Sequence, residues 1–348
     1  MRCLIAGLVA MFVVAPANAA RLDPSDFTST NAVLHWISAY RDHLNPDGVP
    51  VIMKAASRLG AFENPERAGV YIGFLAGVLT DNPQQAEEIA ARTFAVPARD
   101  RWIVMRAIAY SNLPNWRELM RRFACRMPRY DVLSDKYING KMATLAEFEV
   151  PPAQSGFERW GKRLHLDKMF GGGSQRLMMT PNPEVLDVLW GYYFATGGYG
   201  PILHIVDMLP LSQDHDDPDR LTVGSMAKFS LASNAMHDQN LLDMLKSTRK
   251  ARGQPTEIVA QLDDVIDAAE SVDIARIRKV ALAAIEEVKA KGPAYKHNAS
   301  LWGYIGQSAI AGGCLAAAAL GQVEIGIPCV VGGAASSAAL NFWNNSPE

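Results

Sequence analysis

The segment GVYIGFLAGVLTDNPQQAEEIAA, Gly69 to Ala91, contains an apolar run, the polar pair Thr80-Asp81, a turn-forming piece and a second run with apolar residues at helical spacing. Similar segments begin at Trp102, Val185 and Val223, and their polar pairs are Ser111-Asn112, Thr196-Gly197 and Ser233-Asn234. The first two pairs lie 31 residues apart and the last two 37. Periods in this range are typical of helix-turn-helix repeats, in which neighbouring hairpins bury each other's apolar faces. We therefore predict an all-α fold of stacked αα-hairpins, helical-repeat-like but irregular, with an ordinary all-α bundle as the alternative.

The hairpin segments fall into two regions, residues 20–127 and 184–292, and the chain between them, 128–183, differs in composition. This interval holds three turn-forming or flexible pieces, NGK, VPP and FGGGS, which begin at Asn139, Val150 and Phe170. We interpret the interval as a loop-rich linker or excursion between the two helical regions. Strand signals are scarce throughout the sequence.

Residues 1–19 have the layout of a secretory signal peptide. Arg2 supplies a positive charge, an apolar run of about a dozen residues follows from Cys3 to Val14, and Ala17-Asn18-Ala19 is a small-x-small cleavage site. The run is shorter than the about 20 residues that a helix needs to cross a bilayer. We therefore predict cleavage after Ala19 and export to the periplasm or the extracellular medium, with an uncleaved anchor as the alternative.

Composition places the chain among globular proteins and argues against several functions. Hydrophobic residues make up 49% of the sequence and charged residues 20%, as expected for a chain with a packed core. The formal net charge is −2, so there is no basic excess to hold nucleic acid. The glycines at 171–173 lack the context of a phosphate-binding loop, and no histidine has zinc-ligand spacing. We predict no cofactor and no nucleic-acid partner.

The C-terminal region, residues 293–348, is rich in Ala and Gly. Its composition predicts two helices in a small-residue hairpin, in which close helix approach is easy. Cys314 and Cys329 would form a disulfide across this hairpin, stabilising it by roughly 3 kcal/mol, and Cys125 would be a buried free thiol. The alternative is a membrane-associated hairpin over residues 302–343, because small-residue faces also drive helix association in lipid.

The most specific catalytic string is Ser225-Met226-Ala227-Lys228. A lysine three residues after a serine shares its helix face and can take its proton, as in penicillin-binding proteins and serine β-lactamases. The partner motifs of those enzymes do not follow, and the nearest approach to one, Tyr137-Ile138-Asn139, lies upstream. In the alternative interpretation Met226, Phe229 and Leu231 pack in a core and Lys228 is solvated.

An acidic segment precedes this string. It contains four carboxylates and one histidine, which could bind a divalent cation through oxygen ligands: Asp214, His215, Asp216, Asp217 and Asp219. The segment lacks the glycine turn and the distal glutamate of a calcium loop. Its alternative interpretation is a solvated turn between helices, with Asp219 near the start of the next one. His204 and Asp207 form a second, locally spaced pair, which we expect near a core face.

Aromatic residues crowd the third hairpin. Trp190, Tyr192, Tyr193 and Tyr199 either fill the groove between helices or present a surface to a ligand. The sequence as a whole predicts an exported, non-catalytic binding or scaffold protein of the cell envelope, whose partner is a protein, a peptide or an envelope polymer. A membrane-associated envelope protein is the first alternative, and an envelope hydrolase using Ser225 and Lys228 is the second.

Overall fold

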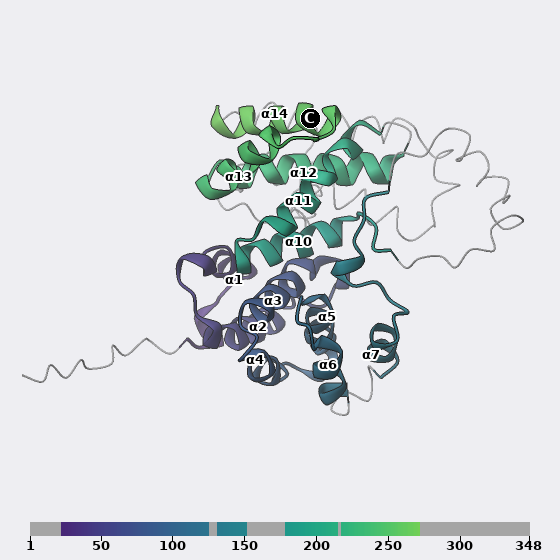
Figure 1. Cartoon of the computed structure of the whole chain (residues 1–348). Coiled ribbons are helices and arrows are strands. Elements are labelled where there is room, and N and C mark those ends of the chain that lie inside the picture. Colours follow the sequence, from purple (N-terminus) through teal and green to yellow (C-terminus); the bar gives the residue numbers. More distant parts are fainter. Residues whose placement is uncertain (1–21, 125–130, 152–177, 215–216, 272–348) are drawn as a thin grey trace, which may run out of the picture.

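The computed structural model describes residues 22–124, 131–151, 178–214 and 217–271 (Figure 1). Within these ranges the chain forms twelve α-helices and several short 3-10 helices, and its only β feature is an isolated bridge between Phe148 and Met179. The predicted all-α fold is confirmed. The predicted signal peptide, the C-terminal hairpin and all four cysteines lie outside the described residues. No helix in the described ranges combines the length and apolar character that crossing a membrane requires.

Each of the four predicted hairpin segments forms two consecutive helices: α3 and α4, α5 and α6, α10 and α11, and α12 and α13. Additional helices precede, separate and follow them. The helices are α1 (Thr30–Ser38), α2 (Val49–Arg58), α3 (Gly69–Asp81), α4 (Ala86–Thr93), α5 (Trp102–Tyr110), α6 (Trp116–Ala124), α7 (Asp131–Ile138), α10 (Pro183–Thr196), α11 (Tyr199–Asp207), α12 (Pro218–Ala235), α13 (Gln239–Lys250) and α14 (Thr256–Glu270). The 3-10 helices used below are η2 (Tyr40–Asp42), η3 (Pro46–Gly48), η7 (Leu145–Glu147) and η8 (Leu209–Gln213).

The polar pairs lie at or near the C-terminal end of the first helix of each hairpin, and their side chains donate hydrogen bonds back to carbonyl oxygens of its last turns. Thr80 and Thr196 donate their hydroxyls to the carbonyls four residues back, at 2.9 and 3.0 Å, and Ser111 donates to the carbonyl three residues back at 2.8 Å. Gly197 follows α10 with a φ of 65°, the left-handed cap that glycine adopts without strain.

Helices of the second half begin at side chains that cap them. The carbonyl or carboxylate oxygens of Asn182, Asp217 and Asp238 accept a hydrogen bond from the backbone N–H three residues on, at 2.9, 3.1 and 3.1 Å. A proline occupies the first turn of α10 and of α12, where no N–H is required. These caps fix where α10, α12 and α13 start.

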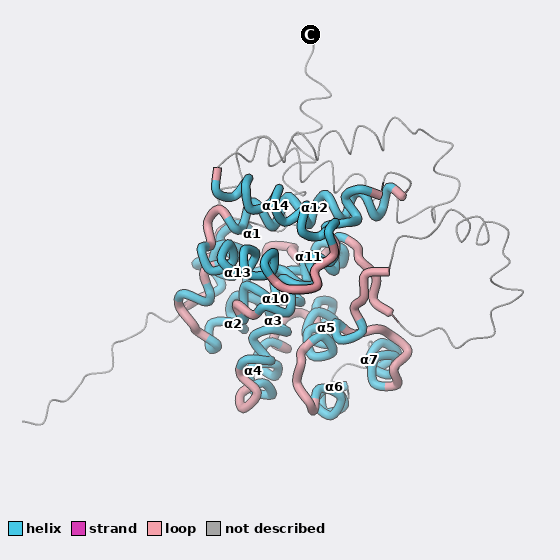
Figure 2. Tube along the Cα trace, turned by 45° about the horizontal axis from the view of Figure 1, so that its top comes forward, coloured by secondary structure: helices cyan, strands magenta, loops and turns pink. Residues whose placement is uncertain are grey.

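Helices α3 and α10 lie side by side at the centre of the fold (Figures 1 and 2). Three glycines of α3 recur at every fourth position and therefore share one face. A Cβ atom at Gly69 would lie 2.5 Å from the carbonyl oxygen of Glu184, one at Gly73 would lie 1.9 Å from that of Val188, and one at Gly77 would lie 2.7 Å from Ala195 Cβ. These partners advance along α10 as the glycines advance along α3, so the two helices run parallel.

The close approach is reciprocal. A Cβ atom at Gly191 of α10 would lie 2.0 Å from the carbonyl oxygen of Val70. Only glycine lets the two backbones come this near. Eleven of the thirteen residues of α3 are buried, because α10 covers one side and α5 and α4 cover others.

The remaining helices form layers on either side of this pair. Figures 1 and 2 show α12, α13 and α14 together at one end of the molecule and α4, α6 and α7 at the other. One continuous apolar cluster extends from Phe27 to Ala269, so the two predicted helical regions share a core. The helix pairs are established, but their classification as a stacked repeat remains a prediction.

The interval predicted as a loop-rich linker contains one more helix than expected. Residues 131–138 form α7, and the Tyr137 ring, which is fully buried, packs edge-on against Tyr110 of α5 with ring centroids 6.1 Å apart. The NGK turn does follow this helix, with Gly140 at a φ of 62°. Burial of one large aromatic side chain thus fixes a helix in a stretch whose composition indicated turns.

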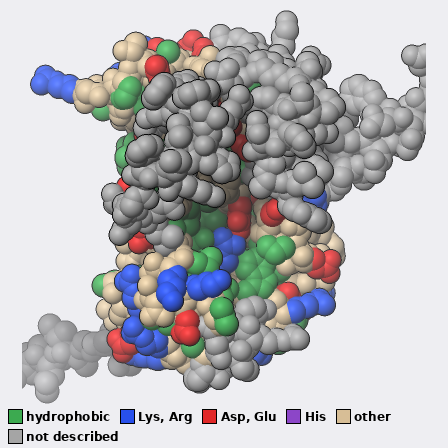
Figure 3. Space-filling view, turned by 90° about the vertical axis from the view of Figure 1, so that its right-hand side faces the viewer, with side chains coloured by type: hydrophobic (Ala, Val, Ile, Leu, Met, Phe, Trp, Pro, Cys, Tyr) green, Lys and Arg blue, Asp and Glu red, His purple; other side chains and the backbone are tan. Residues whose placement is uncertain are grey.

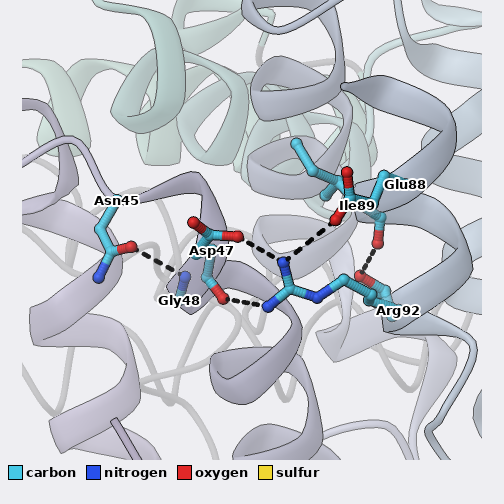
Figure 4. Close-up of polar contacts among 7 residues, drawn as sticks. Asn45, Asp47, Gly48, Glu88, Ile89 and Arg92 are labelled. Carbon is cyan, nitrogen blue, oxygen red and sulfur yellow. Dashed lines mark hydrogen bonds and ion pairs between the residues drawn. The ribbon is translucent and has the colours of Figure 1, made fainter. Parts of the chain in front are cut away.

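A polar cluster on the surface joins η3 to α4 (Figure 4). Arg92 donates to the Asp47 carboxylate and, at 3.1 Å, to the Asp47 carbonyl oxygen, while Glu88 lies one turn before it on α4. Asn45 caps η3 by accepting from Gly48 N at 3.0 Å. The Asp47 side chain is 85% exposed, so this ion pair contributes less than about 1 kcal/mol to stability.

Candidate binding cleft

The ends of three helices meet at one cleft. Helices α3, α5 and α10 each end at a predicted polar pair, and residues of all three pairs line a cleft of about 660 Å³. Its other walls come from the start of α6, from η7 and from α11. The lining combines aromatic and aliphatic side chains with a few polar groups, which is the usual make-up of a ligand site.

Thr80 ties the three helix ends together. Its Oγ1 donates to the carbonyl of Ala76, accepts from Asn112 N at 3.0 Å and accepts from the Tyr192 hydroxyl at 2.8 Å. One hydroxyl at the end of α3 therefore holds the backbone of Asn112, two residues after α5, and the Tyr192 side chain of α10. Three of the four polar pairs that recur along the sequence converge here in space, and Ser233-Asn234 does not line the cleft.

Thr80→Val is expected to lower the free energy of unfolding by about 1–2 kcal/mol, because it leaves the part-buried Tyr192 hydroxyl and the Asn112 N–H without their acceptor. Urea denaturation would measure the change. Thr80→Ser keeps the hydroxyl and should retain most of the stability. A valine variant as stable as the wild type would show that Thr80 does not join the helix ends.

Asp81 is the last residue of α3 and lines the cleft. A carboxylate at a helix C-terminus faces the negative end of the helix dipole, which costs about 0.3–1 kcal/mol. Among the described residues no hydrogen bond or ion pair reaches it, and partial burial raises the pKa of its carboxyl above the ordinary value. Asp81 is thus an exposed carboxylate at the edge of the cleft, with no ion-pair partner among the described residues.

The aromatic residues predicted as a binding surface separate into two groups. Trp190 and Tyr193 are fully buried, and the Trp190 indole donates to Ser230 Oγ at 3.0 Å. Their rings fill the core between α10, α12 and η2 and are not available to a ligand. Tyr192 lines the cleft, and Tyr199, 53% exposed, lies beside it at the start of α11.

The surface next to the cleft is apolar in part. Leu203, 39% exposed, lies one helical turn after Tyr199 on α11, and Gly200 and His204 of the same helix line the cleft. Figure 3 shows one face of the molecule, on which hydrophobic side chains gather near the middle and charged side chains of both signs surround them.

The Ser225 and Lys228 pair lies in the body of α12. Lys228 Nζ donates to Gln261 Oε1 at 2.7 Å and to Asp264 Oδ2 at 2.6 Å, both on α14. The Lys228 residue is 5% exposed, so it is buried and ion-paired where the packing interpretation expected it in solvent. These bonds make the ammonium a donor that joins α12 to α14, which gives the hydrolase interpretation no support.

The acidic segment contributes to helix capping and an ion pair. Asp217 caps α12, Asp219 is the second residue of that helix, and Asp214 accepts from Arg220 Nε at 2.8 Å. His215 and Asp216 lie outside the described residues. Across the described ranges no three His, Cys, Asp or Glu side chains are placed to hold a metal ion.

A second cleft, of about 1190 Å³, is lined by η8, by α14 and by the segment that follows η7. It shares His204 with the first cleft. The His204 ring packs edge-on against Phe148 with centroids 5.0 Å apart, and burial lowers the pKa of His204. This imidazole is therefore mostly neutral at pH 7. Asp214 and Arg220, which pair with each other, also line this cleft.

Comparison of the chain with protein-family models found no match. Comparisons with curated proteins and with solved structures found no significant match either.

Proposed function

We propose that this chain is an exported, non-catalytic binding protein of the cell envelope, and that the cleft at the ends of α3, α5 and α10 holds a segment of a protein, a peptide or an envelope polymer. The cleft itself carries the proposal. It is lined by aromatic, aliphatic and polar residues, it lies beside the exposed Tyr199, and one of its walls carries the Asp81 carboxylate, which has no partner within the described ranges.

The polar groups of the cleft favour binding over catalysis. The hydroxyls of Thr80 and Ser111 are donated to helix carbonyls, so both are committed to ending their helices. His204 packs on Phe148. A serine or threonine nucleophile must donate its hydroxyl to a base, and these two hydroxyls have other acceptors.

Export and membrane association belong to the same proposal. The predicted cleavage after Ala19 would place the described helices in the periplasm or the medium. The hairpin over residues 302–343 would then be a buried element or, in the alternative, a membrane anchor. Both segments lie outside the described residues, and the experiment below includes them because it uses the full chain.

A photo-crosslinking side chain at Gly200 would test the proposal in cells that export the protein. Gly200 lines the cleft, and a Cβ atom there would meet nothing within 4 Å. We expect a discrete adduct in the envelope or secreted fraction, formed by protein whose N-terminus is Ala20. The matched control places the same side chain at Arg252, an exposed residue between α13 and α14.

An adduct at Gly200 but not at Arg252 would support a ligand in the cleft. Equal labelling at both positions, or none at Gly200, would contradict the binding role. Recovery of the protein with Met1 intact in the cytoplasm would contradict export, and retention in carbonate-washed membranes that is lost on truncation after Ser300 would favour the membrane alternative.

A further inference from the structure

We infer that the cleft receives a basic side chain of a peptide, with its ammonium or guanidinium group at the Asp81 carboxylate. This inference rests on the proposed function and names the chemistry of the ligand. It is carried by three independent features: the helix ends that meet at the cleft, the position of Asp81 and the apolar walls.

The first feature is electrostatic. Each helix end carries roughly half a negative charge on its last carbonyls. Helices α3 and α10 run parallel, and α3, α5 and α10 all end at the same cleft. Helices α6 and α11 begin at the same cleft and bring partial positive charge to it. Three C-termini against two N-termini leave a smaller negative excess, which favours cations and hydrogen-bond donors.

The second feature is Asp81, which adds a full negative charge at the same place. Local rules disfavour a carboxylate at this end of a helix, and side chains that break local rules without compensation concentrate at functional sites. The described lining contains no Lys or Arg. Among the described residues, burial raises the pKa of the Tyr40 and Tyr192 hydroxyls, and the Asp81 carboxylate, which lies close enough for its charge to act on them, raises it further. The missing positive charge would come from a ligand.

The third feature favours a peptide side chain over a small inorganic cation. Trp116, Leu113 and Tyr110 supply apolar walls of the same cleft. Lysine and arginine carry their charge on an apolar stem that packs on such walls while the charged end keeps a polar partner. Arg117 stacks on one face of the Trp116 ring, with its guanidinium carbon 4.4 Å from the ring centroid, so that face is already covered and the other walls must hold the stem.

The test compares two peptides that differ only in charge. Fluorescein-labelled tetra-arginine and its tetra-citrulline counterpart, which has the same shape without the charge, would be titrated with the full exported protein and followed by fluorescence anisotropy. We expect tetra-arginine to bind at least about fivefold more tightly, and Asp81→Asn to weaken it by about fivefold, as for a part-exposed ion pair. Tetra-citrulline binding should not change.

Asp47→Asn is the matched control, because it neutralises an exposed carboxylate away from the cleft. It should leave both affinities unchanged. Asp81→Asn should also unfold at the same temperature as the wild type or higher, since it removes an unfavourable charge from a helix end. A merely structural role for Asp81 would lower that temperature instead.

Three results would overturn the inference: equal affinity for the two peptides, an unchanged tetra-arginine affinity in Asp81→Asn, or an equal loss in Asp47→Asn. Stronger binding of a glucosamine tetramer than of tetra-arginine would assign the cleft to an aminated glycan and overturn the peptide assignment. In each case an adduct at Gly200 would still support the proposed binding role. The crosslinking result therefore tests the binding role, and the peptide titrations test the basic ligand.

Discussion

Gly73→Ala is expected to lower the free energy of unfolding by roughly 3 kcal/mol, one of the largest effects of any methyl group added to this chain. Alanine gains about 1 kcal/mol of helix propensity over glycine. That gain is outweighed because the new Cβ would lie 1.9 Å from the Val188 carbonyl oxygen and 2.7 Å from its carbonyl carbon. Both are backbone atoms that cannot rotate away, so α3 and α10 must separate and lose their packing.

Urea denaturation followed by circular dichroism would measure this loss. Gly191→Ala should behave alike, since its Cβ would lie 2.0 Å from the Val70 carbonyl oxygen. The double variant should lose less than the sum, because either change alone opens the same interface. The matched control is Gly200→Ala, a helical glycine with open space around it, which should be neutral or slightly stabilising. A fully stable Gly73→Ala variant would contradict the parallel contact of α3 and α10.

Asp238→Ala should have the second largest effect, again roughly 3 kcal/mol. Asp238 Oδ2 accepts from Arg41 at 2.6 Å and from the Tyr193 hydroxyl at 2.8 Å, while Oδ1 caps α13. The Arg41 guanidinium also lies over the Tyr193 ring, 4.4 Å from its centroid. Removing the carboxylate costs the cap, worth about 1 kcal/mol, and leaves a part-buried cation and hydroxyl without their acceptor, at about 1–3 kcal/mol in total.

This contribution depends on pH in a defined direction. Burial alone would raise the pKa of Asp238, but the hydrogen bonds from Arg41, Leu241 N and Tyr193 together lower it below the ordinary value of 3.8. A carboxyl whose pKa is lower in the folded state stabilises fully above its unfolded pKa and loses that contribution as pH falls through the folded pKa. The difference in stability between the wild type and Asp238→Asn should therefore shrink below about pH 4.

Thermal unfolding between pH 7 and pH 2 would show this convergence. Asp238→Asn suits the pH series because asparagine also caps helices, so the variant isolates the charge. Asp47→Ala is the control for removal of an ion-paired carboxylate, and its 85% exposure predicts a loss below about 1 kcal/mol. Equal losses in Asp238→Ala and Asp47→Ala would show that the Asp238 network adds nothing beyond a surface ion pair.

Much of the local structure could be predicted from the sequence, because the apolar runs and polar pairs follow local rules. The four helix pairs form where the runs lie, and Thr80, Ser111 and Thr196 end their helices as polar pairs should. Helix α7 was missed because the turn-forming residues around it dominate its segment. Its stability comes from burial of Tyr137 against α5, which a local pattern does not contain.

The helix that packs against α3 could not be predicted from the hydrophobic periodicity of the sequence. Nearly every residue of α3 is buried, so its pattern has no polar face to orient it. The spacing of Gly69, Gly73 and Gly77 was the available signal for close packing, although it does not name α10 as the partner.

The cleft could not be located for a similar reason. Thr80 and Asn112 come from neighbouring hairpins, whereas Tyr192 is more than 100 residues away from Thr80 in the sequence. Only the parallel packing of α3 on α10 brings Tyr192 to Thr80. The repetition of polar pairs was the clue that these positions share a role, and it did not indicate that they meet.

The parallel contact of α3 and α10 also sets an order of events in folding. About 115 residues separate Gly73 from Val188, so a large loop must close before the central interface forms, and such non-local contacts form slowly. During synthesis the apolar α3 emerges long before the helix that covers it. In that interval its surface is open to aggregation. The apolar surface of α3 is covered only when α10, Pro183 to Thr196, has been synthesised and has packed against it.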